Sequence, residues 1–191
     1  MKITVTRIAT TVVMSAVMSA LLGAAGCTLL TPNPFAPLHP HWSDFSSPQA
    51  RHYVNFPGRS KQSLKETKTP TGTASTYLRD LQVGDRYYGT AWTLVPGGTA
   101  APSVQARILE IASAEALRIN PGAKLISKQA VLNEGITGLA YVIDVPQSKT
   151  VLRQQIFMVS DVLVEQTYAG PSGTEFEREP GRFFDSLKLL P

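Results

Sequence analysis

The residue with the clearest chemistry is Cys27, whose thiol is the only one in the 191-residue chain. Three small residues, 24–26, precede it directly and close an apolar run over residues 8–22, which follows the basic Lys2 and Arg7. A basic start, an apolar stretch and small residues beside the scissile bond are typical of a secretory signal. A cysteine directly after such a site is the residue that becomes lipidated in bacterial lipoproteins. We therefore expect cleavage before Cys27 and a lipid on its sulfur.

Two alternatives remain for this segment: an ordinary cleaved signal followed by a cysteine of no special role, and an uncleaved membrane anchor. The apolar run is at the short end of the about 20 residues that a bilayer-spanning helix needs. Ala24 stands where leucine is usual, three residues before the cysteine. Thr28, in place of aspartate, favours sorting to the outer membrane. The sequence thus predicts a lipid-anchored protein of the cell envelope, on the periplasmic face of the outer membrane.

Charge and polar motifs argue against several function classes. Removal of the signal takes away Lys2 and Arg7 and lowers the formal net charge from +4 to +2, so the basic balance does not indicate nucleic-acid binding. The chain has no G-x-S-x-G motif and no serine three residues before a lysine. A histidine-based mechanism would rest on His52 alone, which we interpret as a surface residue of the first strand. We expect no enzyme.

The sequence contains few residues that could form a metal site or an anion site. His39 and His41 lie in a proline-rich stretch where Asp44 is the one further candidate ligand, which is fewer than a zinc site needs. The pair at 97–98, both glycine, precedes a predicted helix, but no Gly-Lys-Ser/Thr completes a phosphate loop. We expect no metal and no cofactor.

One local charge bias lies where the folded part should begin. Its basic members are Arg51, Arg59, Lys61, Lys65 and Lys68, opposed only by Glu66. Such a strip could contact an acidic partner or anionic lipid headgroups, with each basic residue near a bilayer contributing about 1 kcal/mol. The alternative, which we prefer, is a solvated edge strand whose lysines prevent pairing with other chains.

The elements that must position these residues divide the chain into three parts. Residues 1–26 form the signal, residues 27–50 form a proline-rich extended tether, and residues 51–191 form one domain. The domain must be stable through its core, because it has no disulfide. Expected strands cover residues 53–56, 60–68, 75–82 and 86–95, a helix covers residues 102–120, and strands at 124–132, 136–145, 150–160 and 162–168 form an antiparallel meander.

A second helix should close the domain. Ser172 and Glu175 have the spacing of a capping box. Glu175 lacks the glycine-containing loop of a calcium site, and we interpret it, with Glu177 and Glu179, as negative charge favouring a helix start. Alternatively, the helix begins at Pro180. The strand aromatics are interpreted as packing residues rather than a ligand groove: Tyr53, Tyr87, Tyr88 and Trp92.

The order of strand, hairpin, helix, four-stranded meander and closing helix resembles the PsbP-like family, which includes several bacterial envelope lipoproteins. Short islands carry the resemblance across about residues 51–191: Phe56-Pro57-Gly58, Gly135-Ile136-Thr137-Gly138, Arg153-Gln154-Gln155-Ile156-Phe157-Met158-Val159 and Phe183-Phe184-Asp185-Ser186-Leu187. The resemblance implies an α+β fold, with an antiparallel sheet flanked by helices in an α/β/α sandwich. It also implies a non-catalytic role, in binding a protein partner or assisting the assembly of a membrane complex.

From these features we expect a membrane-anchored envelope lipoprotein, attached through Cys27, that acts as a protein-binding or assembly accessory. The alternative is a carrier of a small ligand or lipid, which would use a pocket between the sheet and a helix. A reproducible protein partner would favour the first function, and a co-purifying small molecule would favour the second.

Replacing Cys27 with serine should abolish lipid incorporation, because the chain has no other thiol to accept the lipid. Metabolic labelling with radioactive palmitate, read on the immunoprecipitated protein, measures this. The neighbouring Thr28→Ser variant should be labelled like the unchanged protein. Labelling that persists in Cys27→Ser would overturn the prediction.

Overall fold

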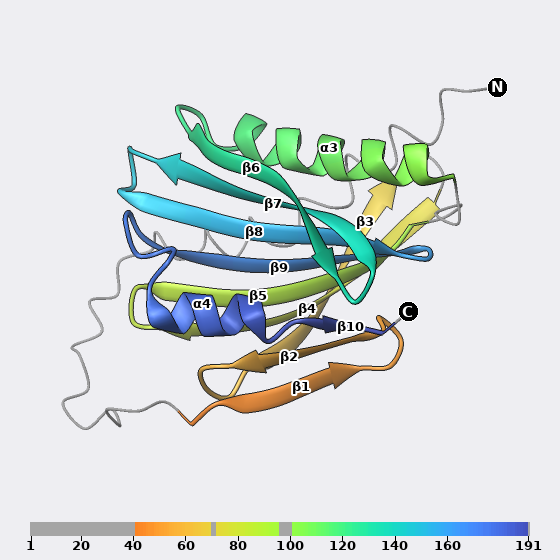
Figure 1. Ribbon diagram of the computed structural model, residues 1–191, viewed down its shortest axis with the longest axis horizontal. Coiled ribbons are helices and arrows are strands. Elements are labelled where there is room, and N and C mark those ends of the chain that lie inside the picture. Colours follow the sequence, from red (N-terminus) through yellow and green to blue (C-terminus); the bar gives the residue numbers. More distant parts are fainter. Residues whose placement is uncertain (1–40, 70–71, 96–100, 191) are drawn as a thin grey trace.

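The computed structural model describes residues 41–69, 72–95 and 101–190, which form two antiparallel sheets and two helices (Figure 1). The strands of the large sheet are β3 (Lys61–Thr69), β4 (Gly72–Val83), β5 (Arg86–Leu94), β6 (Lys124–Asn133), β7 (Ile136–Val145), β8 (Thr150–Val159) and β9 (Val162–Pro171). The small sheet contains β1 (Ser43–Ser47), β2 (His52–Phe56) and β10 (Lys188–Leu189), and the helices are α3 (Pro102–Arg118) and α4 (Arg178–Asp185). The large sheet has the order β3-β4-β5-β9-β8-β7-β6, and the small sheet has the order β1-β2-β10.

The predicted antiparallel meander is confirmed, because β6, β7, β8 and β9 are consecutive neighbours in the large sheet. Asn133 pairs with Ile136, so Glu134 and Gly135 alone form the first turn. Their φ angles of 48° and 81° are the left-handed values that a two-residue hairpin turn requires. Val83 pairs with Arg86, so Gly84 and Asp85 form the turn between β4 and β5, and there only Gly84, with φ 59°, has a left-handed value.

One face of the large sheet packs against α3. Alternate side chains of the strands point to this face, among them Ile156 and Leu163, which are fully buried. The helix contributes a stripe at helical spacing, formed by Ile108, Leu109, Ala112 and Ala116. The helix predicted over residues 102–120 is therefore confirmed, and it ends at Arg118, just before the Asn120-Pro121-Gly122 stop.

The opposite face of the large sheet is covered by α4 and the small sheet together. Phe183 of α4 packs against Tyr88 and Tyr168, and its ring centroid lies 5.3 Å from that of Tyr88. Leu187 and Leu189 continue this layer toward β10. The fold is α+β, an antiparallel sheet with a helix on each face, as predicted. The small sheet is an addition to the second layer.

The paired strands begin earlier than predicted. β1 lies inside the 27–50 segment assigned to the tether, ahead of Arg51. Pro48, the one proline of that segment within the described residues, lies in the turn after β1 and so does not interrupt its pairing with β2. At the other end of the domain, the two-residue β10 pairs with β2, and the backbone N–H of Leu190 donates to the oxygen of Arg51 at 2.7 Å.

The predicted capping box is wrong. The Ser172 hydroxyl donates to Asp144 Oδ1 at 2.9 Å instead of capping a helix. α4 begins at Arg178, with Glu177 at the cap position and no side-chain cap. A contact with a residue distant in sequence thus takes the serine away from the local motif.

Glycines of the large sheet make room for aromatic rings. Gly138 of β7 lies opposite Phe157 of β8. A Cβ atom at Gly138 would lie 2.3 Å from Phe157 Cδ1 and 2.5 Å from the backbone oxygen of Ile156. Phe157 is 1% exposed, so its ring has no space to move away. Gly89 under Tyr87 and Gly170 under Tyr168 repeat the arrangement.

The Gly138→Ala variant should lower the free energy of unfolding by about 1–3 kcal/mol, the usual effect of overpacking a core. Urea denaturation measures the change. Gly181→Ala is the matched control, because a Cβ on this helical glycine meets nothing within 4 Å. That control should raise stability by up to about 1 kcal/mol. Equal stability of the two variants would contradict the packing argument.

Candidate functional site

β3 is an outer strand of the large sheet and carries part of the predicted basic strip. Lys61 and Lys65 lie on the same face of β3, opposite Asp80 and Thr76 of β4, and Arg59 precedes the strand in an exposed position. Arg51 is separated from these residues by the whole length of β2. The side chain of Lys68 lies outside the described part. The structure therefore brings together Arg59, Lys61 and Lys65, on an edge strand located where the sequence predicted one.

β6 is the other outer strand, and it presents apolar side chains to solvent. Leu125 is 44% exposed, Ile126 is 57% exposed and Leu132 is 72% exposed. Ile126 lies at a bulge, because the register with β7 shifts between Leu125 and Ser127. Long outer strands with exposed apolar side chains readily pair with another chain. β6 is therefore a candidate partner-binding edge, and the sequence analysis did not identify it.

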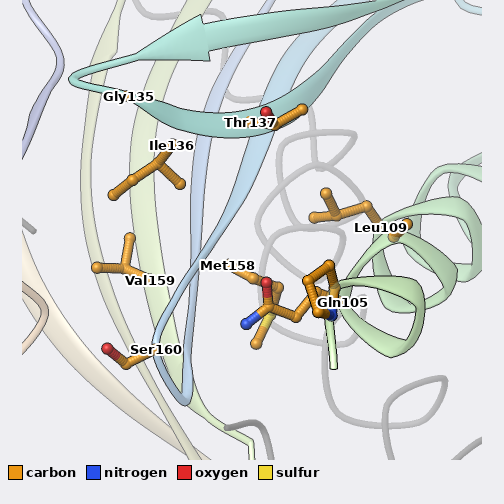
Figure 2. A pocket seen from close by; sticks show the side chains of 10 residues that line it. Gln105, Leu109, Gly135, Ile136, Thr137, Met158, Val159 and Ser160 are labelled. Carbon is orange, nitrogen blue, oxygen red and sulfur yellow. The ribbon is translucent and has the colours of Figure 1, made fainter. Parts of the chain in front are cut away.

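A cavity of about 700 Å³ opens between α3 and two turns of the large sheet (Figure 2). Leu109 of α3 and Met158 of β8 contribute apolar surface, and Ile136 adds to it from the turn between β6 and β7. Gln105 and Ser160 supply polar groups. This is a cavity between sheet and helix, the kind of site that the carrier alternative requires.

A smaller cavity of about 340 Å³ lies beside Arg153 on the α4 face of the sheet. The guanidinium carbon lies 4.1 Å from the ring centroid of Phe184 and 5.2 Å from that of Phe176. Its Nη1 donates to the backbone oxygen of Glu175 at 3.0 Å. Burial lowers the pKa of Arg153, and the charges of Asp185 and Glu175 oppose that shift. These two carboxylates already compensate the cation, so the cavity is not a strong anion site.

A chain of buried polar side chains crosses the α3 face. The Tyr141 hydroxyl donates to Gln154 Oε1, and Gln154 Nε2 donates to Glu165 Oε2 at 3.1 Å. Burial raises the pKa of Glu165 to about 8, so this carboxyl is mostly protonated at neutral pH. Glu165 Oε1 and the Tyr87 hydroxyl have no hydrogen-bond partner among the described residues. The sequence signal for this site is Glu165 with Gln166 and Thr167, a polar triplet inside a strand that begins and ends with apolar residues.

His52 is not the surface residue that the sequence predicted. Its ring is fully buried, with ring centroids 5.7 Å from Phe45 and 5.4 Å from Trp92. Thr90 Oγ1 lies 3.1 Å from His52 Nε2 and donates to the backbone oxygen of Glu165. This arrangement favours the tautomer that carries its proton on Nε2. Burial lowers the pKa of His52 to about 4, so the ring is neutral at pH 7 and packs between aromatic residues.

The glutamates near α4 form ion pairs. Glu177 Oε2 lies 2.6 Å from Arg86 Nη2, and Glu179 Oε2 lies 3.9 Å from Arg86 Nη1. These pairs connect α4 to β5. In the part of the chain that the structure describes, no three histidine, cysteine, aspartate or glutamate side chains are grouped to hold a metal ion.

The remaining sequence candidates include packing residues, exposed residues and undescribed positions. His41 is exposed, and Tyr53 is half-buried, with its hydroxyl donating to Asp44 Oδ1 at 2.6 Å. Tyr87, Tyr88 and Trp92 are buried, which confirms their predicted packing role. Cys27, His39 and the glycine pair at 97–98 lie outside the described residues. Of the described helices, neither is long and apolar enough to cross a membrane.

No protein-family model matches the chain, and a search of curated proteins gives no match. Among solved structures, cyanobacterial PsbP (CyanoP) from Synechocystis sp. PCC 6803 is similar, with a TM-score of 0.53 and 11% sequence identity, over 85% of this chain and 99% of that chain. The chain has a PsbP-like fold. At this identity the similarity concerns the fold alone, and it confirms the fold implied by the sequence islands.

Two further solved structures are more distant. A protein of unknown function from Pseudomonas aeruginosa, described as a regulator, has a TM-score of 0.36 and 15% identity, over 74% of this chain and 90% of that chain. A protein from Bacteroides thetaiotaomicron has a TM-score of 0.36 and 16% identity, over 78% of this chain and 48% of that chain.

Glu165→Gln should change how stability depends on pH. The folded state keeps the Glu165 proton up to a pKa of about 8, whereas an unfolded glutamate loses it near 4.5. Between these values the folded state binds more protons, so stability falls as pH rises, by up to about 1.4 kcal/mol per pH unit. The variant should therefore match the unchanged protein near pH 4.5 and be the more stable protein at pH 8.

Urea denaturation across this pH range measures the difference between the two proteins. The contribution of His52 is common to both and cancels. Glu66→Gln, at an exposed position of β3, is the control and should leave the profile unchanged. If the free energy of unfolding depends on pH in the same way for Glu165→Gln and for the unchanged protein, the raised pKa of Glu165 is refuted.

Proposed function

We propose that the chain is a lipid-anchored envelope protein, on the periplasmic face of the outer membrane, which binds a protein partner or assists the assembly of a membrane complex. It does so without catalysing a reaction. The observation that carries the proposal is β6, a long outer strand with exposed apolar side chains. The non-catalytic role implied by the PsbP-like resemblance supports the same function.

The two outer strands differ in how they discourage pairing. β3 has three lysines along its length, and lysines on an edge strand deter the addition of another strand. β6 has Lys124 and Lys128, and the ammonium of Lys128 is engaged by Glu110 of α3. The free side of β6 can therefore accept an extended segment through main-chain hydrogen bonds, while its apolar side chains provide selectivity.

Anchoring through Cys27 supports this function because it raises the local concentration of the domain at the membrane. A domain on a tether stays near the bilayer, which raises its effective concentration toward any partner in the same membrane to about the millimolar range. A weak strand-addition contact is then sufficient for occupancy. The membrane would thus be the location where the partner is met, as well as the site of attachment.

A second candidate function is the carriage of a small ligand or lipid. The cavity of about 700 Å³ beside Leu109 favours it, because it lies between sheet and helix and combines apolar walls with a few polar groups (Figure 2). Its lining residues Leu109 and Met158 are, however, largely buried by their own neighbours. This leaves less apolar surface for a ligand than its volume suggests, so we rank the carrier second.

A photo-crosslinking amino acid at position 132 should trap a defined protein in living cells, because Leu132 projects from the free strand. The same amino acid at position 176 is the control, since Phe176 is 66% exposed and lies outside β6. With the photo-crosslinking amino acid kept at position 132, adding the charges Leu125→Glu and Ile126→Lys should abolish capture without lowering the melting temperature. Phe176→Lys should leave capture intact.

Capture that survives the β6 substitutions would refute β6 as the binding edge. A chain that captures no protein, but shows a reproducible bound mass by native mass spectrometry, would favour the carrier.

A further inference from the structure

An apolar patch lies at the opposite edge of the large sheet, on its α4 face. Leu64 of β3 pairs with Tyr77 of β4, and Tyr77 pairs with Trp92 of β5, so the three side chains form a row across the strands. The Tyr77 ring is stacked on that of Trp92, with centroids 5.4 Å apart and planes within 11°. Leu64 is 53% exposed, Tyr77 39% and Leu94 57%. We call Leu64, Tyr77 and Leu94 the β3–β4 patch.

Cations lie along the same edge of the sheet, with Lys61 and Lys65 on the face of β3 opposite to Leu64 and Glu66. Arg59 and Lys61 are exposed, and Lys65 follows on the same face of β3 as Lys61. Because β3 is outermost, long basic side chains from one face and Leu64 from the other both reach the edge. Glu66 and Asp80 offset part of this charge, which leaves the edge cationic. Apolar side chains with an aromatic residue, bordered by cations, match the interfacial layer of an anionic bilayer.

The chain enters the described domain beside these cations. Ser43, the first residue of β1, pairs with Phe56, and its hydroxyl donates to the backbone oxygen of Gly58, which precedes Arg59. In Figure 1 the chain reaches β1 at the lower left, near the point where the chain leaves β2 toward β3. The segment between Cys27 and Trp42 spans at most roughly 50 Å when fully extended. A lipid on Cys27 would therefore limit the distance between the bilayer and this corner of the domain to that span, and the patch and its cations would have to select the docked orientation.

We propose that the β3–β4 patch and its basic border rest on an anionic lipid surface while the domain is anchored. This inference rests on the proposed lipid anchor and adds an orientation to it. Five strands of the large sheet separate β3 from β6. A bilayer against β3 therefore leaves β6 free to meet a protein partner. The two described lysines of β3, Lys61 and Lys65, then serve two purposes: they prevent strand pairing and they contact headgroups.

Site-specific fluorescence on the full lipidated chain tests the orientation. The lipid occupies the sulfur of Cys27, so Leu64→Cys supplies the one free thiol for an environment-sensitive dye. Leu132→Cys, on β6, is the matched control. The labelled chains are reconstituted in vesicles of three parts phosphatidylethanolamine and one part phosphatidylglycerol, some with spin-labelled acyl chains. We expect the spin labels to quench the dye at position 64 and to leave the dye at position 132 unaffected.

The charge contribution is tested in the same vesicles. Arg59→Glu with Lys61→Glu should shift the equilibrium toward the undocked domain by roughly fivefold or more per substituted residue, which corresponds to about 1 kcal/mol each. Lys124→Glu with Lys188→Glu, two exposed lysines away from β3, should have little effect. About 1 M KCl, where the Debye length is roughly 3 Å, should mimic the first pair of substitutions.

Three results would overturn the proposal. If the chain floats with vesicles and the dye at position 64 is not quenched, the anchor stands and the orientation is wrong. Equal quenching at positions 64 and 132 would show that no face is preferred. A chain that does not float has no anchor, and then the proposed function and the orientation both fail. Equal melting temperatures across the variants exclude unfolding as the cause of any loss.

Discussion

The constraint on which the rest of the structure depends is that the central strands must be buried on both faces. Nine of the ten residues of β9 are buried, and its neighbour β5 is similar. A sheet in this situation needs a cover on each side, and one helix of ordinary length does not suffice for a seven-stranded sheet. α3 covers one face over β7 and β8, and α4 joins the small sheet to cover the other. Tight turns and glycines beneath aromatic rings follow from the same demand for close packing.

Much of this architecture could be predicted from local sequence. The strand ranges 124–132 and 136–145 and the helix range 102–120 come within two residues of the observed elements, because turn residues such as Glu134-Gly135 and Asn120-Pro121-Gly122 separate them. The misses have a common physical origin, because they depend on contacts between residues far apart in the chain. β1 and β10 are strands only because β2 lies between them. Ser172 caps no helix because Asp144, distant in sequence, takes its hydroxyl.

The candidate sites were less predictable than the fold. The basic residues near β3 could be found by composition, but the separation of Arg51 from Lys61 follows from the direction of β2. No local pattern reveals which strand of a meander will be outermost, so β6 looked like any other strand. His52 and Glu165 are polar residues of strands that also contain other polar residues, and what distinguishes them is the packing of His52 against Trp92 and the hydrogen bond from Gln154 to Glu165. Neither contact can be predicted from the spacing of residues in the sequence.

The closure of the small sheet by β10 has a consequence for the proposed export of the chain. On that route β1 and β2 would be the first strands of the domain to leave a translocation pore, whereas the strand that completes their sheet, Lys188–Leu189, would leave last. A two-stranded hairpin on its own is at best marginally stable in water. On the proposed route, the N-terminal strands would therefore not reach their final pairing until nearly the whole chain had crossed. This chain order delays the folding of β1 and β2 without a chaperone, because β10, which pairs with β2, is far from them in the sequence.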